Sequence, residues 1–234
     1  MEKENTNKEQ STASLFEQFY GKPYSHIKKE DMGEAKELDW GEDVGGESLA
    51  SSGQQILPKT RESAGKHEEL INGKIETTEC NTPEHNQAVR VVAGEFEKKV
   101  GSGCNVFSAN VPLFYGELAD DLGFDSDFFL PDVMVTDDRA KVDSKGVHSA
   151  PVFVAEVATE SSRALDYGYK AIIYFVIGVK EYWVFDMKRK RIVRWLMKES
   201  GASPEKFGFP DTKILTSQIY PHVEINLADV FAVE

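Results

Sequence analysis

One short segment constrains the fold more than any other: residues 151–158 read PVFVAEVA, an almost unbroken apolar run of strand length. Apolar runs that lack polar alternation are typical of strands buried on both faces of a sheet. The sequence therefore predicts a central strand covered on each side. Glu156 is the exception within it, because a buried carboxylate costs several kcal/mol unless an ion pair or a bound metal compensates it.

Helical and extended segments surround this strand. Apolar residues at three- and four-residue steps from Ala88 to Val100 predict a helix. Thr82 can cap its start, and Pro83 fits its first turn. A second helix is expected at 162–176, with Gly178 ending it. The sequence predicts an α/β domain, with a hairpin around Asn72-Gly73, strands at 104–109, 111–115, 128–135, 181–186 and 191–197, and an extended edge segment with a short terminal turn at 214–231.

The first 66 residues differ from the rest in composition. They are rich in Glu, Lys, Ser, Gly and Gln, and their bulky apolar residues are too scattered to build a core. Such a segment cannot offset the roughly 1–2 kcal/mol per residue that ordering a backbone costs. We therefore expect residues 1–66 to form a disordered, acidic amino-terminal tail and residues 67–234 to form one folded domain.

Charge and hydropathy exclude several classes of protein. The chain has 27 Lys and Arg against 40 Asp and Glu, so its net charge of −13 argues against the broad basic face of most tight nucleic-acid binders. Its longest apolar run, residues 171–179, is about half of the roughly 20 residues that span a bilayer. Cys80 and Cys104 match no zinc or redox spacing. These features predict a cytoplasmic protein with reduced thiols and no membrane segment.

Charged residues that flank or interrupt apolar segments form the candidate site. Asp132 stands at the start of an expected strand, and Glu156 lies inside the buried one. Asp166, Lys170 and Tyr174 recur at four-residue steps, which places them on one face of the expected helix. Two acidic groups from neighbouring strands can hold a hard cation such as Mg²⁺, completed by water and a phosphate oxygen. A buried Glu156–Lys170 ion pair, with Asp132 capping a strand, explains the same residues without any chemistry.

The same residues belong to a pattern that resembles a known family. It consists of Pro131-Asp132, the string EVATESS from Glu156, the three helix positions, and the string GVKEYWVFD at 178–186, of which GVKEYW is the most distinctive part. Over about residues 67–231 the chain resembles the Uma-two family of restriction-endonuclease-like proteins, which belongs to the PD-(D/E)XK nuclease superfamily.

The resemblance implies a fold, a reaction and a site. The fold would be a mixed α+β sheet flanked by helices, the restriction-endonuclease-like PD-(D/E)XK core. The reaction would be hydrolysis of DNA phosphodiester bonds with Mg²⁺, for which Mn²⁺ could substitute. Asp132, Glu156 and the backbone carbonyl of Val157 would bind the metal. Lys170 would position or polarise the attacking water and stabilise the transition state.

Three further residues are candidates for supporting roles. His85, at a helix start, would contact a phosphate or assist proton transfer, although a lone histidine near a helix cap is more often structural. Asp166 would orient Lys170 through an i,i+4 pair, which is the favoured role, or stand in the outer shell of the metal. Tyr174 would pack in the core with its hydroxyl directed toward the site.

Two positions depart from the broader superfamily pattern. Ala158 stands two residues after Glu156, where the signature lysine would be, and the resemblance assigns that role to Lys170 of the following helix. Thr159-Glu160 replaces the usual Ser-Pro, which keeps a hydroxyl but adds negative charge beside the phosphate path.

A basic cluster occupies the expected turn between the strands at 181–186 and 191–197. Its side chains could neutralise a few DNA phosphates and make binding salt-sensitive, although hairpin turns are often basic merely because they are solvated. The cluster consists of Lys188, Arg189, Lys190 and Arg191.

Three functions are compatible with the sequence. The intact Asp, Glu and Lys set favours a Mg²⁺-dependent endonuclease acting on DNA. The acidic net charge favours a non-catalytic binding or regulatory protein with the nuclease fold. Hydrolysis of another phosphate ester is a third, weaker reading. A homodimer would suit cleavage of two strands, but no sequence feature marks an interface.

Overall fold

The computed structural model describes residues 66–79, 82–108, 110–118, 127–137, 141–198 and 201–232. Nearly all of the predicted tail at 1–66 lies outside these ranges, so its disorder stays a prediction. Within the described ranges, no helix is both long enough and apolar enough to cross a membrane.

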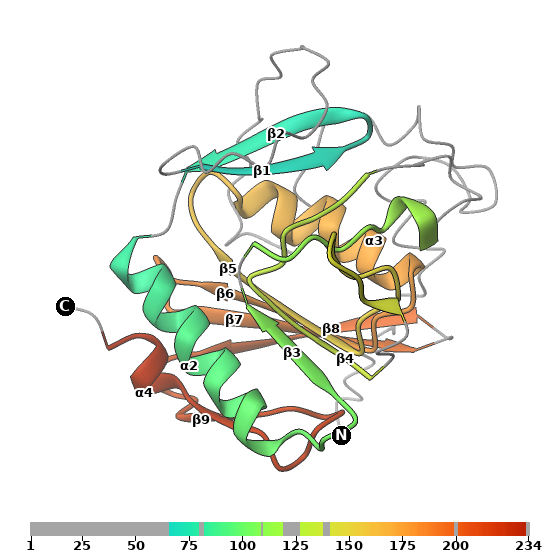
Figure 1. Ribbon diagram of the computed structural model, residues 1–234. Coiled ribbons are helices and arrows are strands. Elements are labelled where there is room, and N and C mark those ends of the chain that lie inside the picture. Colours follow the sequence, from blue (N-terminus) through green and yellow to red (C-terminus); the bar gives the residue numbers. More distant parts are fainter. Residues whose placement is uncertain are drawn as a thin grey trace, which may run out of the picture.

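A six-stranded mixed sheet forms the centre of the molecule (Figure 1). The strand order is β3-β4-β5-β6-β7-β8, with β5 and β6 parallel and the other neighbours antiparallel. The predicted apolar strand is β5, which has a neighbour on each side and is buried along its whole length. The strands are β3 (Asn105–Ser108), β4 (Val133–Thr136), β5 (Phe153–Ala158), β6 (Glu181–Asp186), β7 (Arg191–Lys198) and β8 (Gly201–Gly208).

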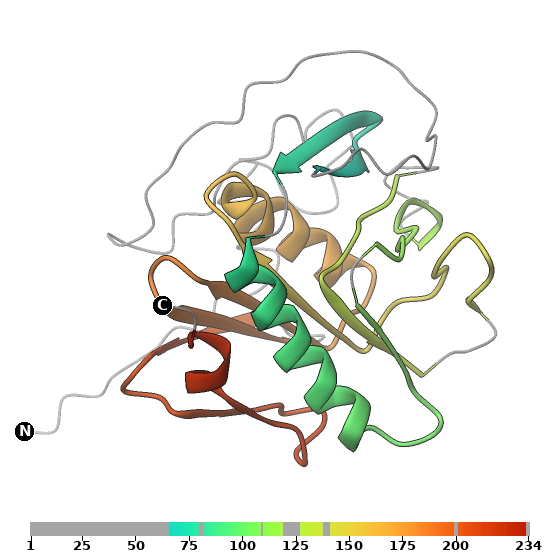
Figure 2. The same ribbon diagram turned by 60° about the vertical axis from the view of Figure 1, so that its left-hand side comes forward.

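Helices cover both faces of this sheet, which confirms the predicted α/β class (Figures 1 and 2). On one face α2 (Pro83–Lys99) packs with α4 (Leu227–Val230) and with a small sheet of β9 (Ile214–Thr216) and β10 (Glu224–Asn226). On the other face lies α3 (Lys170–Val176). As predicted, Thr82 caps α2: its hydroxyl accepts a hydrogen bond from the backbone N–H of His85 at 3.2 Å.

Alternation along β5 divides its side chains between the two faces. Phe153, Ala155 and Val157 join the core under α2, whereas Val154 and Ala158 join the core under α3. Glu156 therefore lies on the α3 face. A strand with no polar alternation thus still presents one charged side chain to the α3 face.

The predicted hairpin around Asn72-Gly73 is present, as β1 (Lys66–Ile71) and β2 (Lys74–Glu79). Asn72 has φ 53° and Gly73 φ 71°, the left-handed conformations that a tight hairpin turn needs. Two backbone hydrogen bonds of 3.1 and 2.9 Å between Leu70 and Phe128 join the hairpin to the segment before β4. The hairpin thereby becomes a fixed part of the domain.

The helix predicted at 162–176 is not a continuous α-helix. Its first part is a π-helical segment, η6 (Leu165–Tyr169), closed by a bond from the Lys170 N–H to the Leu165 carbonyl five residues back. Such π-helical turns are rare, and they occur frequently at functional sites. Hydrophobic spacing alone does not distinguish one wide turn from an α-helical turn, so the prediction was wrong in this detail.

Two extended segments also differ from expectation. The strand β8 was not predicted, because its sequence is polar and contains Pro204; it lies at the edge of the sheet, where proline is tolerated. The strand expected at 111–115 is reduced to isolated bridges of Leu113 with Phe129 and Val147, and the short 3₁₀ helix η3 (Gly116–Leu118) follows it.

Candidate active site

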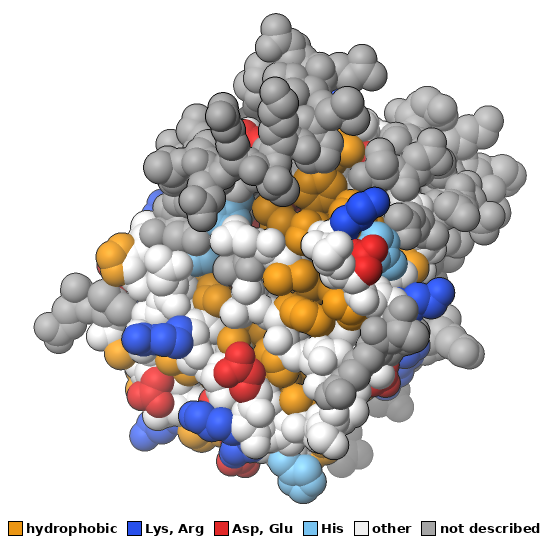
Figure 3. Space-filling view, in the orientation of Figure 1, with side chains coloured by type: hydrophobic (Ala, Val, Ile, Leu, Met, Phe, Trp, Pro, Cys, Tyr) orange, Lys and Arg blue, Asp and Glu red, His pale blue; other side chains and the backbone are white. Residues whose placement is uncertain are grey.

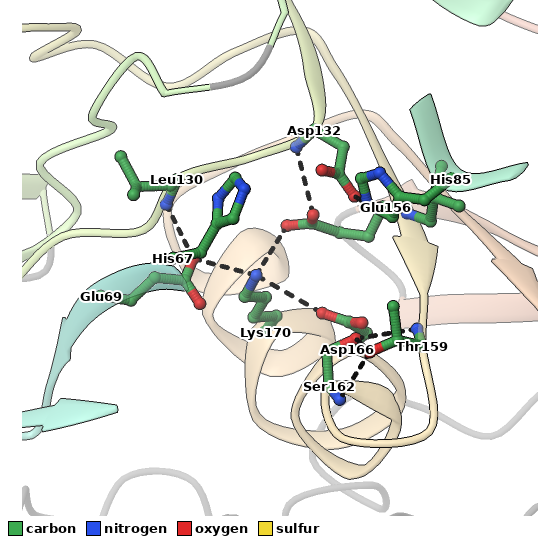
Figure 4. A pocket seen from close by; sticks show the side chains of 11 residues that line it. His67, Glu69, His85, Leu130, Asp132, Glu156, Thr159, Ser162, Asp166 and Lys170 are labelled. Atoms are coloured by element: carbon green, nitrogen blue, oxygen red, sulfur yellow. Dashed lines mark hydrogen bonds and ion pairs between the residues drawn. The ribbon is translucent and has the colours of Figure 1, made fainter. Parts of the chain in front are cut away.

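A small pocket lies where the β1–β2 hairpin, the start of β4, the end of β5 and the η6–α3 helix meet (Figure 4). Its cavity volume is about 30 Å³, enough for one or two waters or a single ion. Asp132, Glu156 and Lys170 all line it, as the sequence predicted. The complete lining is His67, Glu69, His85, Leu130, Asp132, Glu156, Val157, Thr159, Ser162, Asp166 and Lys170.

Asp132 and Glu156 reach the pocket from adjacent antiparallel strands. Val133 pairs with Ala155, so the residues just before and after this pair stand opposite each other on the same face of the sheet. The Asp132 N–H donates to Glu156 Oε2 at 3.2 Å, and the Val157 N–H donates to Asp132 Oδ2 at 2.7 Å. These reciprocal bonds fix both carboxylates before any ligand arrives.

Lys170 brings the positive charge of the site from the helix. Its Nζ lies 3.0 Å from Glu156 Oε1, 3.0 Å from Glu69 Oε1 and 3.4 Å from Asp166 Oδ1. Burial acts to lower the pKa of Lys170, but the attraction of these carboxylates outweighs it, and the pKa is raised well above its ordinary value. The side chain, with only 4% of the residue exposed, is therefore an ammonium group at neutral pH.

The three predicted supporting residues also contact the site. Tyr174 donates its hydroxyl to Glu156 Oε1 at 2.7 Å, and His85 Nε2 lies 3.2 Å from Asp132 Oδ2. The second ring nitrogen of His85 is buried and has no hydrogen-bond partner among the residues that the structure describes. Each predicted supporting residue thus touches a residue of the predicted catalytic set.

The environments of the two strand carboxylates separate their pKa values. Burial raises the pKa of Glu156 well above its ordinary value, and neighbouring carboxylates add to this effect against the attraction of Lys170. Burial also acts to raise the pKa of Asp132, but the hydrogen bond and charge of His85 outweigh it, and the pKa is lowered. The proton affinity of Glu156 is thus higher than that of Asp132, although both carboxylates lie in the same pocket.

The donor set suits a hard cation held by few protein ligands. Within the described part of the chain, both hydrogen bonds of the Asp132 carboxylate involve Oδ2, which leaves Oδ1 for an ion. Within the described ranges, no group of three or more His, Cys, Asp or Glu side chains forms a metal cage. Mg²⁺ commonly binds through one or two carboxylates and completes its shell with water and phosphate. The residues therefore fit Mg²⁺ better than a metal that needs a full cage.

The basic turn between β6 and β7 does not line the pocket. Lys188 pairs with Glu160 at 2.8 Å, and Arg189 pairs with Asp186 at 3.3 Å, so part of its charge is already neutralised. On the face shown in Figure 3, the Lys and Arg side chains of the described chain stand apart and form no continuous basic area. The contact of Lys188, Arg189, Lys190 and Arg191 with DNA stays a prediction.

Glu69 is the site residue that sequence reasoning missed. It comes from β1, is 4% exposed, and accepts hydrogen bonds from the Leu130 N–H at 2.7 Å and from Lys170. The sequence placed Glu69 only in the extended segment that leads into the Asn72-Gly73 turn and assigned it no role. The string ELING at 69–73 also resembles the family, but nothing in it identifies a partner roughly a hundred residues away.

Asp166 provides a test of the site's electrostatics. Burial, only partly opposed by Lys170, raises the pKa of Asp166 from 3.8 to about 6. Between these pH values the folded protein binds a proton that the unfolded chain has lost, so the contribution of Asp166 to stability falls as pH rises. We expect the free energy of unfolding of Asp166→Asn to rise relative to that of wild type by about 2 kcal/mol between pH 4 and pH 7.

Urea unfolding at several pH values in EDTA measures this difference. Asp211→Asn is the matched control, because Asp211 is exposed and its substitution should give a nearly constant difference from wild type. A difference for Asp166→Asn that is equally constant across this window would contradict the raised pKa.

Comparison with known protein families identifies the family to which the chain belongs. Residues 54–228 match the Uma2 family, described as "Putative restriction endonuclease", and the chain belongs to this family. The resemblance drawn from the motifs is thus confirmed. The match covers both strand carboxylates and Lys170.

The fold is also similar to a solved structure. It is the crystal structure of a "putative nuclease belonging to DUF820" from Anabaena variabilis ATCC 29413, with a TM-score of 0.58 and 17% sequence identity. The alignment covers 75% of this chain and 93% of the other. At that identity the likeness concerns the fold. No match was found among curated proteins.

Proposed function

We propose that the pocket is the active site of a Mg²⁺-dependent endonuclease that hydrolyses DNA phosphodiester bonds. One observation carries the proposal: Asp132 and Glu156 line one pocket on one face of the sheet, with the Lys170 ammonium 3.0 Å from Glu156. Membership of the family described as "Putative restriction endonuclease" supports it. Two fixed carboxylates can bind a metal ion, and a buried ammonium can bind a phosphate oxygen beside it.

The residues of the chain would divide the work as follows. Asp132 and Glu156 would hold the ion, with the Val157 carbonyl as a further ligand. The bound ion would lower the pKa of a water and neutralise charge on the phosphate oxygens. Lys170 would donate hydrogen bonds to a phosphate oxygen or to the attacking water beside Glu156. His85 would keep Asp132 oriented through its hydrogen bond to Oδ2.

The basic turn would contribute phosphate contacts next to the pocket. Glu160 directly follows the pocket-lining Thr159, and its ion pair with Lys188 is exposed, so a DNA phosphate could replace the Glu160 carboxylate. Such contacts add affinity that falls with salt and carries no sequence preference. They would offset part of the repulsion expected from the acidic chain.

Incubation of the full-length protein with supercoiled plasmid and with DNA and RNA oligonucleotides tests the proposal. We expect nicked or shortened DNA with Mg²⁺ or Mn²⁺ and intact DNA in excess EDTA. Glu156→Gln, purified in parallel, should leave DNA intact, because the amide cannot supply the ligand charge. No product from wild type with either metal, or equal product from the variant, would overturn the assignment.

A non-catalytic nuclease-fold binding or regulatory protein is the second candidate. The hydrogen bonds of the Glu156 carboxylate favour this candidate, because Lys170, Tyr174 and the Asp132 N–H all donate to it. A site completed by its own ion pair needs no metal for stability. DNA retention in a binding assay without cleavage under the conditions above is the result expected of this candidate.

A further inference from the structure

Lys170 is held from two opposite sides, and one of them is the hairpin. Figure 4 shows Glu69 on one side of the ammonium and Asp166 on the other, with Glu156 between them on the side of Asp132. The Glu69 and Glu156 contacts are equally short at 3.0 Å, and the Asp166 contact is longer at 3.4 Å. The hairpin therefore contributes one of the two strongest ion pairs of this lysine.

We propose that Glu69 is a positioning residue for Lys170 in the hydrolysis reaction, an inference that rests on the proposed function. A divalent ion bound to Glu156 would compete with the ammonium for the same carboxylate. Lys170 then needs other anions to keep it in the pocket instead of turning away from the like charge. Glu69 supplies the closer of the two that remain, at 3.0 Å against 3.4 Å for Asp166, and it comes from an element that carries no proposed metal ligand.

The geometry of Glu69 suits this role because the carboxylate is itself held rigidly. Its Oε1 accepts the Leu130 N–H at 2.7 Å, two residues before Asp132. The strand that carries it is joined to Phe128 by two hydrogen bonds, and the Asp127 carboxylate accepts from the N–H of Gly73 in the hairpin turn at 3.0 Å. Glu69 therefore links the segment that delivers Asp132 to the side chain of Lys170.

A contact with the aromatic core completes the restraint on the lysine. Lys170 Nζ lies 5.5 Å from the ring centroid of Phe129, within range of a cation–π interaction. Phe129 and Leu130 belong to the segment that also binds the hairpin. Because the same short segment contacts Lys170 and orients Glu69, loss of the Glu69 charge should change the position of the ammonium before it changes the metal ligands.

Glu69→Gln tests the proposal, since glutamine keeps the shape and can still accept the Leu130 N–H. We expect kcat for DNA cleavage to fall by about tenfold or more, with KM and the affinity for Mn²⁺ alone unchanged, because misplacing a reacting group slows the step without weakening binding. Glu68→Gln is the matched control: Glu68 is the exposed neighbour on the same strand, and its kcat should equal that of wild type. Glu69→Asp should recover part of the lost rate.

A double-mutant cycle separates positioning from other roles. If Glu69 acts through Lys170, adding Glu69→Gln to Lys170→Met should cause no further loss of kcat. In ¹⁵N-lysine-labelled protein, the ammonium signal of Lys170 should be sharp in wild type and weakened in Glu69→Gln. A kcat equal to wild type overturns the inference, and weakened Mn²⁺ binding would make Glu69 a metal ligand instead. An inactive wild type with inactive Glu68→Gln would instead overturn the proposed function.

Discussion

Lys170→Met is expected to reduce DNA cleavage by about 10²–10³-fold and to destabilise the fold by about 3–5 kcal/mol at pH 7. Methionine has a similar length and apolar volume, so the change removes the charge with little effect on packing. It leaves the Glu69, Glu156 and Asp166 carboxylates buried around a neutral side chain. Removing one partner of a buried ion pair costs more than the pair contributes, because the remaining charge stays desolvated.

The destabilisation should depend on pH in one direction. Burial holds the pKa of Glu156 and of Asp166 above their ordinary values even with Lys170 present. Without the ammonium both rise further, so the folded variant binds more protons than its unfolded chain and loses stability as pH rises. The loss relative to wild type should therefore be largest near pH 8 and smallest near pH 5, as measured by urea unfolding in EDTA.

Lys188→Met is the control for this prediction. Lys188 also forms a close ion pair, 2.8 Å from Glu160, but 69% of its side chain is exposed to solvent. Exposed pairs contribute about 0–1 kcal/mol, so this variant should stay close to wild type at each pH. If Lys170→Met were as stable as Lys188→Met at pH 8, the carboxylates around Lys170 would not be buried as described.

The central part of this site was predictable because each signal was local. Glu156 stands out as one carboxylate in an apolar strand, and a buried charge requires a partner. Lys170 and Tyr174 follow at helical spacing in the next element, and both donate to Glu156. Lys170 and Tyr174 lie together although η6 is π-helical, because α3 begins at Lys170 and keeps the four-residue step to Tyr174.

The parts that could not be predicted depend on distant contacts. Glu69 reaches Lys170 only because Leu70 pairs with Phe128 and places the hairpin over the helix. Nothing in the local pattern around the hairpin indicates which segment it will join. The edge strand β8 likewise owes its extended conformation to pairing with β7, since a polar segment with Pro204 has little strand preference of its own. In both cases tertiary pairing decides the outcome.

The most distinctive string of the sequence, GVKEYW, has a structural explanation outside the pocket. Glu181 is completely buried, on the α2 face of β6, and accepts hydrogen bonds from Trp183 Nε1 at 2.9 Å and from Ser217 Oγ at 2.6 Å. Its carboxylate also accepts from the backbone N–H groups of Gln218 and Ile219 at 3.0 and 3.1 Å. One side chain thus joins the central sheet to the turn between β9 and β10.

Glu181→Ala is expected to lower the free energy of unfolding by about 3–5 kcal/mol, because several buried donors lose their acceptor at once and each unsatisfied group costs about 1–3 kcal/mol. Domains of this kind have total stabilities of about 5–15 kcal/mol, so the variant should unfold far below the wild-type temperature. Thermal unfolding followed by tryptophan fluorescence measures the loss, since Trp183 loses its own partner. Glu181→Gln keeps an acceptor oxygen, so its unfolding temperature should lie between those of Glu181→Ala and wild type.

Glu224→Ala is the matched control for the same small sheet. Glu224 lies on β10 opposite Thr216 and is exposed, so its loss should change stability by less than about 0.5 kcal/mol. Because Glu181 faces α2 and Glu156 faces α3, DNA cleavage per folded molecule at low temperature should be the same in Glu181→Ala as in wild type. An unfolding midpoint for Glu181→Ala equal to that of Glu224→Ala would show that the turn is held by other contacts.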